Sequence, residues 1–135
     1  MGRSLPNAVV VVEDDASVSQ ALTRILRLAG MNPIVYASAE TCLDDKPDWD
    51  AACLIIDVQL PGLGGFALRD RLAALRALPP VIFMTAFDEP DARAQATAAG
   101  AFAFISKPFS GRALLDLVER ANAPPRTTLP KGFPG

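Results

Sequence analysis

The sequence predicts an α/β fold in which a doubly wound, five-stranded parallel sheet is covered by helices on both faces. Two observations lead to this expectation. Short apolar runs alternate along the chain with longer segments whose apolar residues recur at helical spacing, an alternation that is typical of parallel βαβ units. Three of the runs, at residues 9–12, 55–56 and 81–84, are continuously apolar, as central parallel strands are because both of their faces are buried.

The strands are predicted at the five apolar runs. These runs span residues 8–12, 33–36, 52–56, 81–84 and 101–105. Cys53 lies within the third run, and we interpret it as a core residue. Together with Cys42 it forms neither a disulfide framework nor the spacing of a metal site, so the cysteines predict no chemistry.

The first three helices are predicted between these runs. The first spans residues 17–29 and is expected to stop at Gly30. Its apolar face consists of Val18, Leu22, Ile25, Leu26 and Ala29. The second begins at Ser38, a good N-cap, and fails before Pro47. The third runs from about residue 65 to 77, and its inward side chains are Phe66, Leu68, Leu72 and Leu75.

The last two helices differ in how much apolar surface they offer. The fourth, residues 89–99, contains no large apolar residue, so we expect the core to anchor it loosely. The fifth starts at Ser110 and carries Leu114, Leu115, Leu117 and Val118. Residues 123–135, APPRTTLPKGFPG, are rich in Pro and Gly and lack periodicity. We therefore expect one domain over residues 1–122, followed by a linker or disordered tail.

Composition argues against several classes of function. The chain has 135 residues, of which 50% are hydrophobic, and a net charge of −2, which suits one folded domain. It has no cluster of Lys and Arg that would indicate direct nucleic-acid binding, and no apolar run near the roughly 20 residues of a membrane span. The N-terminal MGRSLPN does not read as a signal peptide, so a cytoplasmic location is expected. The lack of histidine removes any histidine phosphocarrier role.

Polar side chains follow four of the five predicted strands. They are Glu13, Asp14 and Asp15 after the first strand, Asp57 after the third, Thr85 after the fourth, and Ser106 and Lys107 after the fifth. Each has a structural explanation when taken alone, such as helix capping for Asp14 or Asp15. Sites in such sheets form at the carboxyl ends of the strands, where the strand order reverses. The joint occurrence of these residues therefore predicts a single site.

The combination of carboxylates, a hydroxyl and an ammonium indicates phosphoryl transfer. Carboxylate oxygens bind a hard divalent cation such as Mg²⁺, and an aspartate can act as nucleophile toward a phosphoryl group. Mg²⁺, the Lys107 ammonium and the Thr85 hydroxyl would each serve one phosphoryl oxygen. Asp57 ends a strand that is otherwise apolar, where a charge is unfavourable, and we interpret it as the nucleophile.

Four stretches that cover most of the chain match a known family. They are VVVVEDDASV, LIIDVQLPGLGGF, VIFMTAF and GAFAFISKPFS. Together they resemble the receiver domain of two-component response regulators. The resemblance implies a flavodoxin-like sheet in the order 2-1-3-4-5. It also implies a signalling domain, not an enzyme with its own substrate, that takes part in its own phosphorylation and dephosphorylation.

The resemblance also implies a phosphorylation site with bound Mg²⁺. Asp57 would accept the phosphoryl group from a histidine kinase or phosphotransfer protein. Asp14 and Asp57 would ligate Mg²⁺ directly, Glu13 through a water, and Gln59 through its backbone carbonyl. Asp15 would fall outside this set and begin the first helix. This sequence departs from the family pattern at two positions. The first is Glu13, which stands where Asp is also common and whose side chain reaches further.

Further residues are assigned to the phosphoryl group and to the switch. Thr85 and Lys107 would contact the phosphoryl group, whereas Gln59 and Ala86 would control access to it. Thr85 and Phe104 would form the switch, and the Lys107–Pro108 bond would be cis. Phe104 stands where tyrosine is frequent, so no hydroxyl holds it outside, and we expect the unphosphorylated protein to sample its inward form. Partners, or a second copy in a homodimer, would dock on the fourth helix, fifth strand and fifth helix.

Three other functions are weighed against the residues. A hydrolase that uses an aspartyl phosphate commonly has a second acid two positions after the nucleophile, where this chain has Gln59. A phosphorylation-independent pseudo-receiver scaffold is disfavoured by the complete set of Asp14, Asp57, Thr85 and Lys107. A dinucleotide-binding fold lacks its Gly-rich turn after the first strand. The cognate kinase and the output stay open, and the receiver is equally compatible with a stand-alone protein, a DNA-binding regulator or a hybrid kinase.

Overall fold

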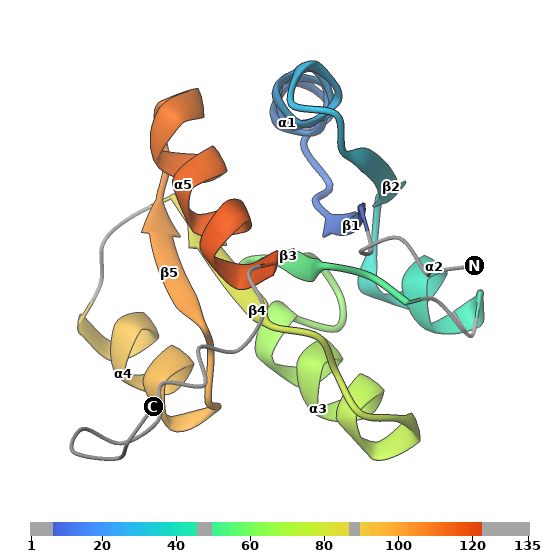
Figure 1. The fold of residues 1–135 in the computed structure, drawn as a ribbon. Helices are drawn as coiled ribbons and strands as arrows, with labels where there is room; N and C mark the ends of the chain where they lie inside the picture. The colour runs from blue at the N-terminus through green and yellow to red at the C-terminus, as the bar shows by residue number, and fades with distance from the viewer. Residues whose placement is uncertain (1–6, 46–49, 87–89, 123–135) are drawn as a thin grey trace, which may run out of the picture.

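A computed structural model describes residues 7–45, 50–86 and 90–122 of the chain. Five parallel strands form one sheet in the order β2-β1-β3-β4-β5, which confirms the expected fold (Figure 1). The elements in chain order are β1 (Ala8–Val12), α1 (Ala16–Leu28), β2 (Asn32–Tyr36), α2 (Ala39–Asp44), β3 (Cys53–Asp57), α3 (Gly65–Leu75), β4 (Val81–Thr85), α4 (Pro90–Ala98), β5 (Ala103–Ser106) and α5 (Gly111–Asn122).

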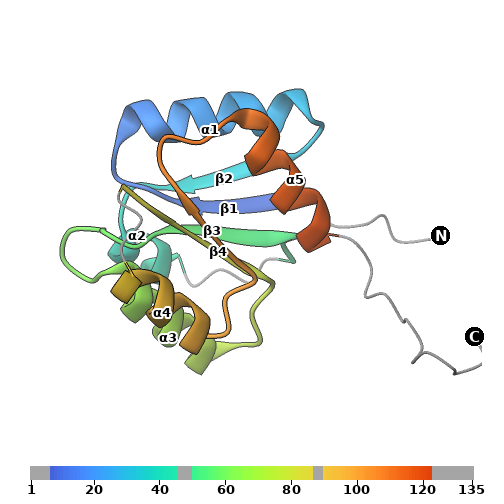
Figure 2. The ribbon, with the colours of Figure 1, turned by 90° about the vertical axis from the view of Figure 1, so that its left-hand side faces the viewer.

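The sheet separates two apolar cores, one under each layer of helices. Alternate residues of β1, β3 and β4 point to opposite faces, as the pleat of a strand requires. One face packs against α1 and α5, and the other packs against α2, α3 and α4 (Figure 2). The central strands β3 and β4 are buried along their whole length, whereas the edge strands β2 and β5 are partly exposed. The continuous apolar runs therefore mark the centre of the sheet, as expected.

Helix α1 has a defined cap at each end. The Asp15 carboxylate accepts hydrogen bonds from the backbone N–H groups of Ser17 and Val18, which confirms that Asp15 begins this helix. At the other end Gly30 has a φ of +83°, a conformation that glycine adopts without strain. Leu22 and Leu26 are fully buried, as predicted. Ala29 is exposed, so the prediction that it belongs to the apolar face is wrong.

Helices α2 and α3 begin where the sequence indicates. Ser38 caps α2, because its hydroxyl accepts a hydrogen bond from the N–H of Thr41. The predicted limit of this helix at Pro47 lies outside the described residues. Helix α3 ends at Leu75, two residues earlier than predicted. The prediction that Leu75 points inward is wrong: 64% of its surface is exposed, because it is the last residue of the helix and solvent, not another element, faces it.

The second half of the domain differs from the predicted bounds in small ways. Helix α4 buries only Ala92 and Ala96, in agreement with the expected weak anchoring. Its predicted first residue, Glu89, lies outside the described residues, as does the predicted tail at 123–135. Strand β5 begins at Ala103 and not at residue 101, because Ala101 still belongs to the turn after α4, where its N–H bonds the carbonyl of Ala96. None of the helices described is long and apolar enough to cross a membrane.

Candidate functional site

The strand order brings the carboxyl ends of β1 and β3 side by side. Val12 is opposite Ile56 in the parallel register, so Glu13 and Asp57 follow at the same level of the sheet. Both carboxylates are almost completely buried. Strand β2 lies on one side of β1 and β3 lies on the other, so the order of the strands reverses at this point. The predicted acids therefore meet at the topological switch point.

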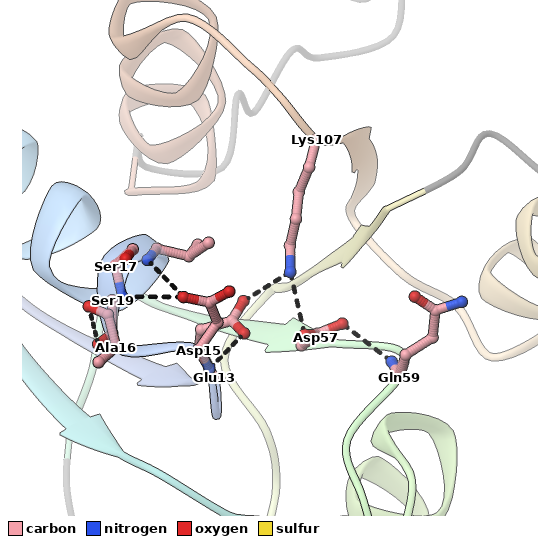
Figure 3. Close-up of polar contacts among 9 residues, drawn as sticks. Glu13, Asp15, Ala16, Ser17, Ser19, Asp57, Gln59 and Lys107 are labelled. Atoms are coloured by element: carbon pink, nitrogen blue, oxygen red, sulfur yellow. Dashed lines mark hydrogen bonds and ion pairs between the residues drawn. The ribbon is translucent and has the colours of Figure 1, made fainter.

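Lys107 joins these two carboxylates. Its side chain extends from the loop after β5 and ends between Glu13 and Asp57 (Figure 3). The Nζ atom lies 2.9 Å from Oε1 of Glu13 and 3.1 Å from Oδ2 of Asp57. Burial alone lowers the pKa of the Lys107 ammonium, but its close contacts with the two carboxylates outweigh that effect and raise the pKa. The lysine is therefore held in its charged form.

Glu13 has two differently placed oxygens. Oε2 accepts a hydrogen bond of 3.0 Å from the backbone N–H of Asp15, which ties the side chain to the start of α1. Oε1 is buried and has the ion pair with Lys107 but no hydrogen bond of good geometry within the described residues. Burial, together with the nearby Asp57 carboxylate, raises the pKa of Glu13. Glu13 is thus a buried carboxyl group with one incompletely satisfied oxygen.

Asp57 is fixed by contacts on both of its oxygens. Oδ1 accepts a hydrogen bond of 2.9 Å from the backbone N–H of Gln59, and Oδ2 pairs with Lys107. Just behind it, Gly65 lies so close to the chain that an added Cβ would be 2.3 Å from the carbonyl oxygen of Asp57. A glycine is therefore required where α3 begins, and the packing holds the Asp57 backbone in place.

The site has the donor set of a hard divalent cation. Glu13, Asp14 and Asp57 each offer a carboxylate oxygen, and these oxygens lie within 4.8 Å of one another. Asp14 is exposed, so the cluster opens to solvent on its side. Oxygen ligands, an open side and the unsatisfied Oε1 of Glu13 suit Mg²⁺, which keeps several waters when bound. The residues present therefore fit the predicted ion.

The remaining predicted residues lie around this cluster. Thr85 ends β4 and is fully buried, and its carbonyl accepts a 2.7 Å hydrogen bond from the N–H of Lys107. Ala86 and Gln59 are both exposed, at the ends of β4 and β3. The Lys107–Pro108 bond is cis, as the resemblance implied. The structure thus gathers at one edge of the sheet the residues that the sequence placed at four strand ends.

Phe104 lies apart from the carboxylates, in the middle of β5, and is half-buried. The guanidinium of Arg93, on α4, lies 4.7 Å from the centroid of the Phe104 ring. A cation over an aromatic face at this distance is attracted by the electrons of the ring. Phe104 therefore has a contact with α4 even though it lacks a hydroxyl, and the sampling of an inward form stays a prediction. Sequence reasoning missed Arg93, because no local pattern shows which side chain of α4 reaches β5.

These features define a receiver. The model of the response regulator receiver domain matches residues 9–119, and this chain belongs to that family, the signalling modules of two-component systems. Among its relatives, nodulation protein W of Bradyrhizobium diazoefficiens is 38% identical over 113 residues, which are 84% of this chain and 50% of that protein. The transcriptional regulatory protein FixJ of the same organism is 31% identical over 113 residues, 84% of this chain and 55% of FixJ.

Solved structures show the same fold. A response regulator receiver protein from Burkholderia phymatum has 42% sequence identity and a TM-score of 0.77, and the match covers 89% of this chain and 98% of that one. The structure titled FixJ-N has 30% identity and a TM-score of 0.78 over 85% of this chain and 92% of that chain. The present chain spans about half the length of the two curated relatives above, nodulation protein W and FixJ.

Proposed function

We propose that this receiver domain accepts a phosphoryl group on Asp57 from a histidine kinase or a phosphotransfer protein. One observation carries the proposal. The Asp57 carboxylate is buried at the end of β3, yet both of its oxygens are oriented, by the Gln59 N–H and by Lys107, beside two further carboxylates. A charge kept in such a place is unfavourable for folding and is explained by a chemical role.

Mg²⁺ would be held by Asp14 and Asp57 directly, by Glu13 through a water, and by the backbone carbonyl of Gln59. When bound, the ion supplies positive charge that offsets the negative charge of the carboxylates and of the phosphoryl oxygens. The protein's own part is to hold the acids in register across β1 and β3. Asp14, which is exposed, leaves a side on which water ligands remain.

Transfer consists of one substitution at phosphorus. A carboxylate oxygen of Asp57 attacks the phosphorus of a phosphohistidine, an O–P bond forms, the P–N bond breaks, and its electron pair returns to the imidazole nitrogen. Lys107, already 3.1 Å from Asp57, neutralises a second phosphoryl oxygen. The Thr85 hydroxyl binds a third. Gln59 and Ala86, exposed at the rim, set the access of water and partners to the phosphoryl group.

The switch then runs from the site to the α4–β5–α5 surface. The Thr85 hydroxyl moves toward the phosphoryl oxygen and vacates space beside β4, and Phe104 turns into that space. The turn breaks the contact between Phe104 and Arg93 and so shifts α4, which the core anchors only through alanines. A partner, or a second copy of this chain, docks on the altered surface. This cytoplasmic signalling domain binds no nucleic acid itself.

The test is covalent labelling of the whole chain. Incubation with Mg²⁺ and acetyl phosphate should add the mass of one phosphoryl group, and hydroxylamine should remove it because the bond is an acyl phosphate. Asp57→Asn should take up none. If the folded wild-type protein gains no mass with Mg²⁺ and acetyl phosphate, or with a phosphorylated kinase, the proposal is wrong and the phosphorylation-independent scaffold is favoured.

A further inference from the structure

The loop between β3 and α3, residues 58–64, carries the Gln59 carbonyl and therefore shapes one side of the site. Its first residue is bonded to the sheet, and the first residue of α3 is bonded back to it. The N–H of Val58 bonds the carbonyl of Met84 on β4, and the N–H of Gly65 bonds the carbonyl of Val58. Between them, the side chain of Leu60 is buried, whereas Pro61 and Gly62 are exposed. The middle of the loop thus depends on contacts with other elements.

Helix α2 supplies one such contact through Glu40. Its Oε2 accepts a hydrogen bond of 2.9 Å from the backbone N–H of Leu63. Glu40 is in the first turn of α2, where the positive end of the helix dipole favours a carboxylate. The hydrogen bonds from the Leu63 N–H and from its own backbone N–H lower the pKa of the Glu40 carboxyl, so the acceptor is charged at neutral pH.

Gly62 shows how closely the carboxylate approaches the loop. A Cβ added at Gly62 would be 2.7 Å from Oε2 of Glu40, so a larger residue there would require the carboxylate to move away from its place beside the loop. Gly62 also has a φ of +74°, which other residues adopt with strain. The loop backbone and the Glu40 carboxylate are therefore fitted to each other, and the glycine serves both.

From this geometry we propose that Glu40 is a positioning residue for the phosphorylation site. It holds the loop through Leu63, four residues after Gln59, and so fixes where the Gln59 carbonyl and N–H lie relative to Asp57. Glu40 touches neither Asp57 nor a phosphoryl group; it acts through the loop. The role rests on the proposed function, because it matters only if the loop contributes a ligand to Mg²⁺.

The test compares three variants that each remove one negative charge from α2. Glu40→Ala removes the charge and the acceptor, Glu40→Gln keeps an oxygen acceptor without the charge, and Asp44→Ala removes a charge from the exposed end of the same helix. Two measurements are made on the full chain: amide exchange of Leu63 in chelator, and Mg²⁺ affinity by calorimetry. The first needs no bound metal and reports the contact itself.

Glu40→Ala should speed Leu63 exchange and weaken Mg²⁺ binding by about three- to tenfold, the range expected for one hydrogen bond of ordinary net strength. Glu40→Gln should recover most of the affinity, and Asp44→Ala should stay near wild type in both measurements. Equal Mg²⁺ affinity in Glu40→Ala and Asp44→Ala would overturn the positioning role, even if Leu63 exchange differed. A wild type that binds no Mg²⁺ would instead refute the proposed function and the positioning role with it.

A double-mutant cycle tests the fit between the loop and the carboxylate. Gly62→Ala should weaken Mg²⁺ binding in the wild-type background through both the strained φ and the clash with Glu40. In the Glu40→Ala background the clash is gone, so the same change should weaken binding less. Additive effects on Mg²⁺ affinity would show that Glu40 and Gly62 do not act through one another, and would contradict the proposal.

Discussion

Single residues at the site carry opposing charges, and the proposed function predicts that their balance makes the stability of the protein depend on Mg²⁺. Asp57 and Glu13 share one cation, Lys107, while Asp14 adds a further charge at the surface. Two like charges at about 4 Å repel by roughly 4 kcal/mol at an effective dielectric near 20, before relaxation. Lys107 offsets part of this repulsion. We therefore expect the clustered carboxylates to destabilise the fold when no metal is bound.

We expect Asp57→Asn to raise the free energy of unfolding in chelator, on the order of 1 kcal/mol, because it removes part of this repulsion. The gain should shrink in Mg²⁺, which stabilises only the protein that keeps the carboxylate. Thermal unfolding of both proteins, with chelator and with millimolar Mg²⁺, measures the effect. A melting temperature for the variant in chelator that is equal to or below that of the wild type would contradict this reading of the site.

The raised pKa of Glu13 predicts how the stability of the metal-free protein changes with pH. Burial raises its pKa in the folded protein above the value in the unfolded chain, so the folded state binds this proton more tightly. The resulting contribution to stability is complete below the unfolded pKa and is lost as the pH rises through the raised, folded pKa. In chelator, Glu13→Gln should therefore gain stability relative to wild type between pH 4 and neutrality. A constant difference in melting temperature across that range would argue against a raised pKa.

The Lys107→Ala variant distinguishes a role at the phosphoryl group from a role in metal binding. The ammonium lies among the carboxylates and competes for them, so its removal should leave Mg²⁺ affinity unchanged or increase it. In the proposed function the ammonium contacts a phosphoryl oxygen, so the output that follows phosphorylation should be lost. Calorimetric Mg²⁺ titration gives the affinity, and amide exchange in residues 90–104 after phosphorylation gives the output. A tenfold or greater loss of Mg²⁺ affinity would show that the assigned role is mistaken.

Among the elements, α4 is anchored more weakly than α1 and is suited to move. It buries two alanines, whereas α1 buries Leu22 and Leu26, and each buried methylene contributes about 0.8 kcal/mol. The contact between Arg93 and Phe104 adds roughly 0.5–1 kcal/mol at an exposed position. This single contact is therefore a large share of what joins α4 to β5, and the switch proposed above breaks it.

We expect a beryllofluoride mimic of phosphorylation to change amide exchange and chemical shifts in residues 90–104 more than in residues 16–28. Arg93→Gln should speed exchange in α4 even without the mimic, because it removes the cation over Phe104. Arg24→Gln, an exposed arginine on α1, is the matched control and should leave α4 unchanged. Thr85→Ala should still bind the mimic but lose the response at Phe104. A stronger response in α1 than in α4 would exclude this switch.

For the molecule as a whole, the proposed function predicts that Mg²⁺ binding and folding are linked. The carboxylates that would bind the ion come together only in the folded chain. Asp14 follows β1 and Asp57 ends β3, and the pairing of these two strands in the sheet brings them close. Mg²⁺ at ten times its dissociation constant should stabilise the wild type by about 1.4 kcal/mol, or a few degrees in melting temperature. Unfolding curves across a Mg²⁺ titration measure this. The absence of any stabilisation would show that the cluster does not bind the ion.

The periodicity of apolar residues determined the elements and the core of this protein. A run that is apolar throughout, such as residues 81–84, has one stable location, between two layers of helices, because burial on both faces is favourable there. The apolar stripe with Leu22 and Leu26 likewise determines which face of α1 meets the sheet. Since parallel strands all end at the same edge, the residues that follow them were predicted as one site from their positions alone.

Tertiary structure alone decided which side chains meet and how. Glu13, Asp57 and Lys107 are far apart in the sequence, and their shared ion pair depends on strand register and on the path of the loop after β5. The contacts of Arg93 with Phe104 and of Glu40 with Leu63 follow from how α4 and α2 pack on the sheet. Local patterns specify which residues are buried, because burial depends on hydrophobicity along one element. They do not specify pairs, because a pair depends on the relative placement of two elements.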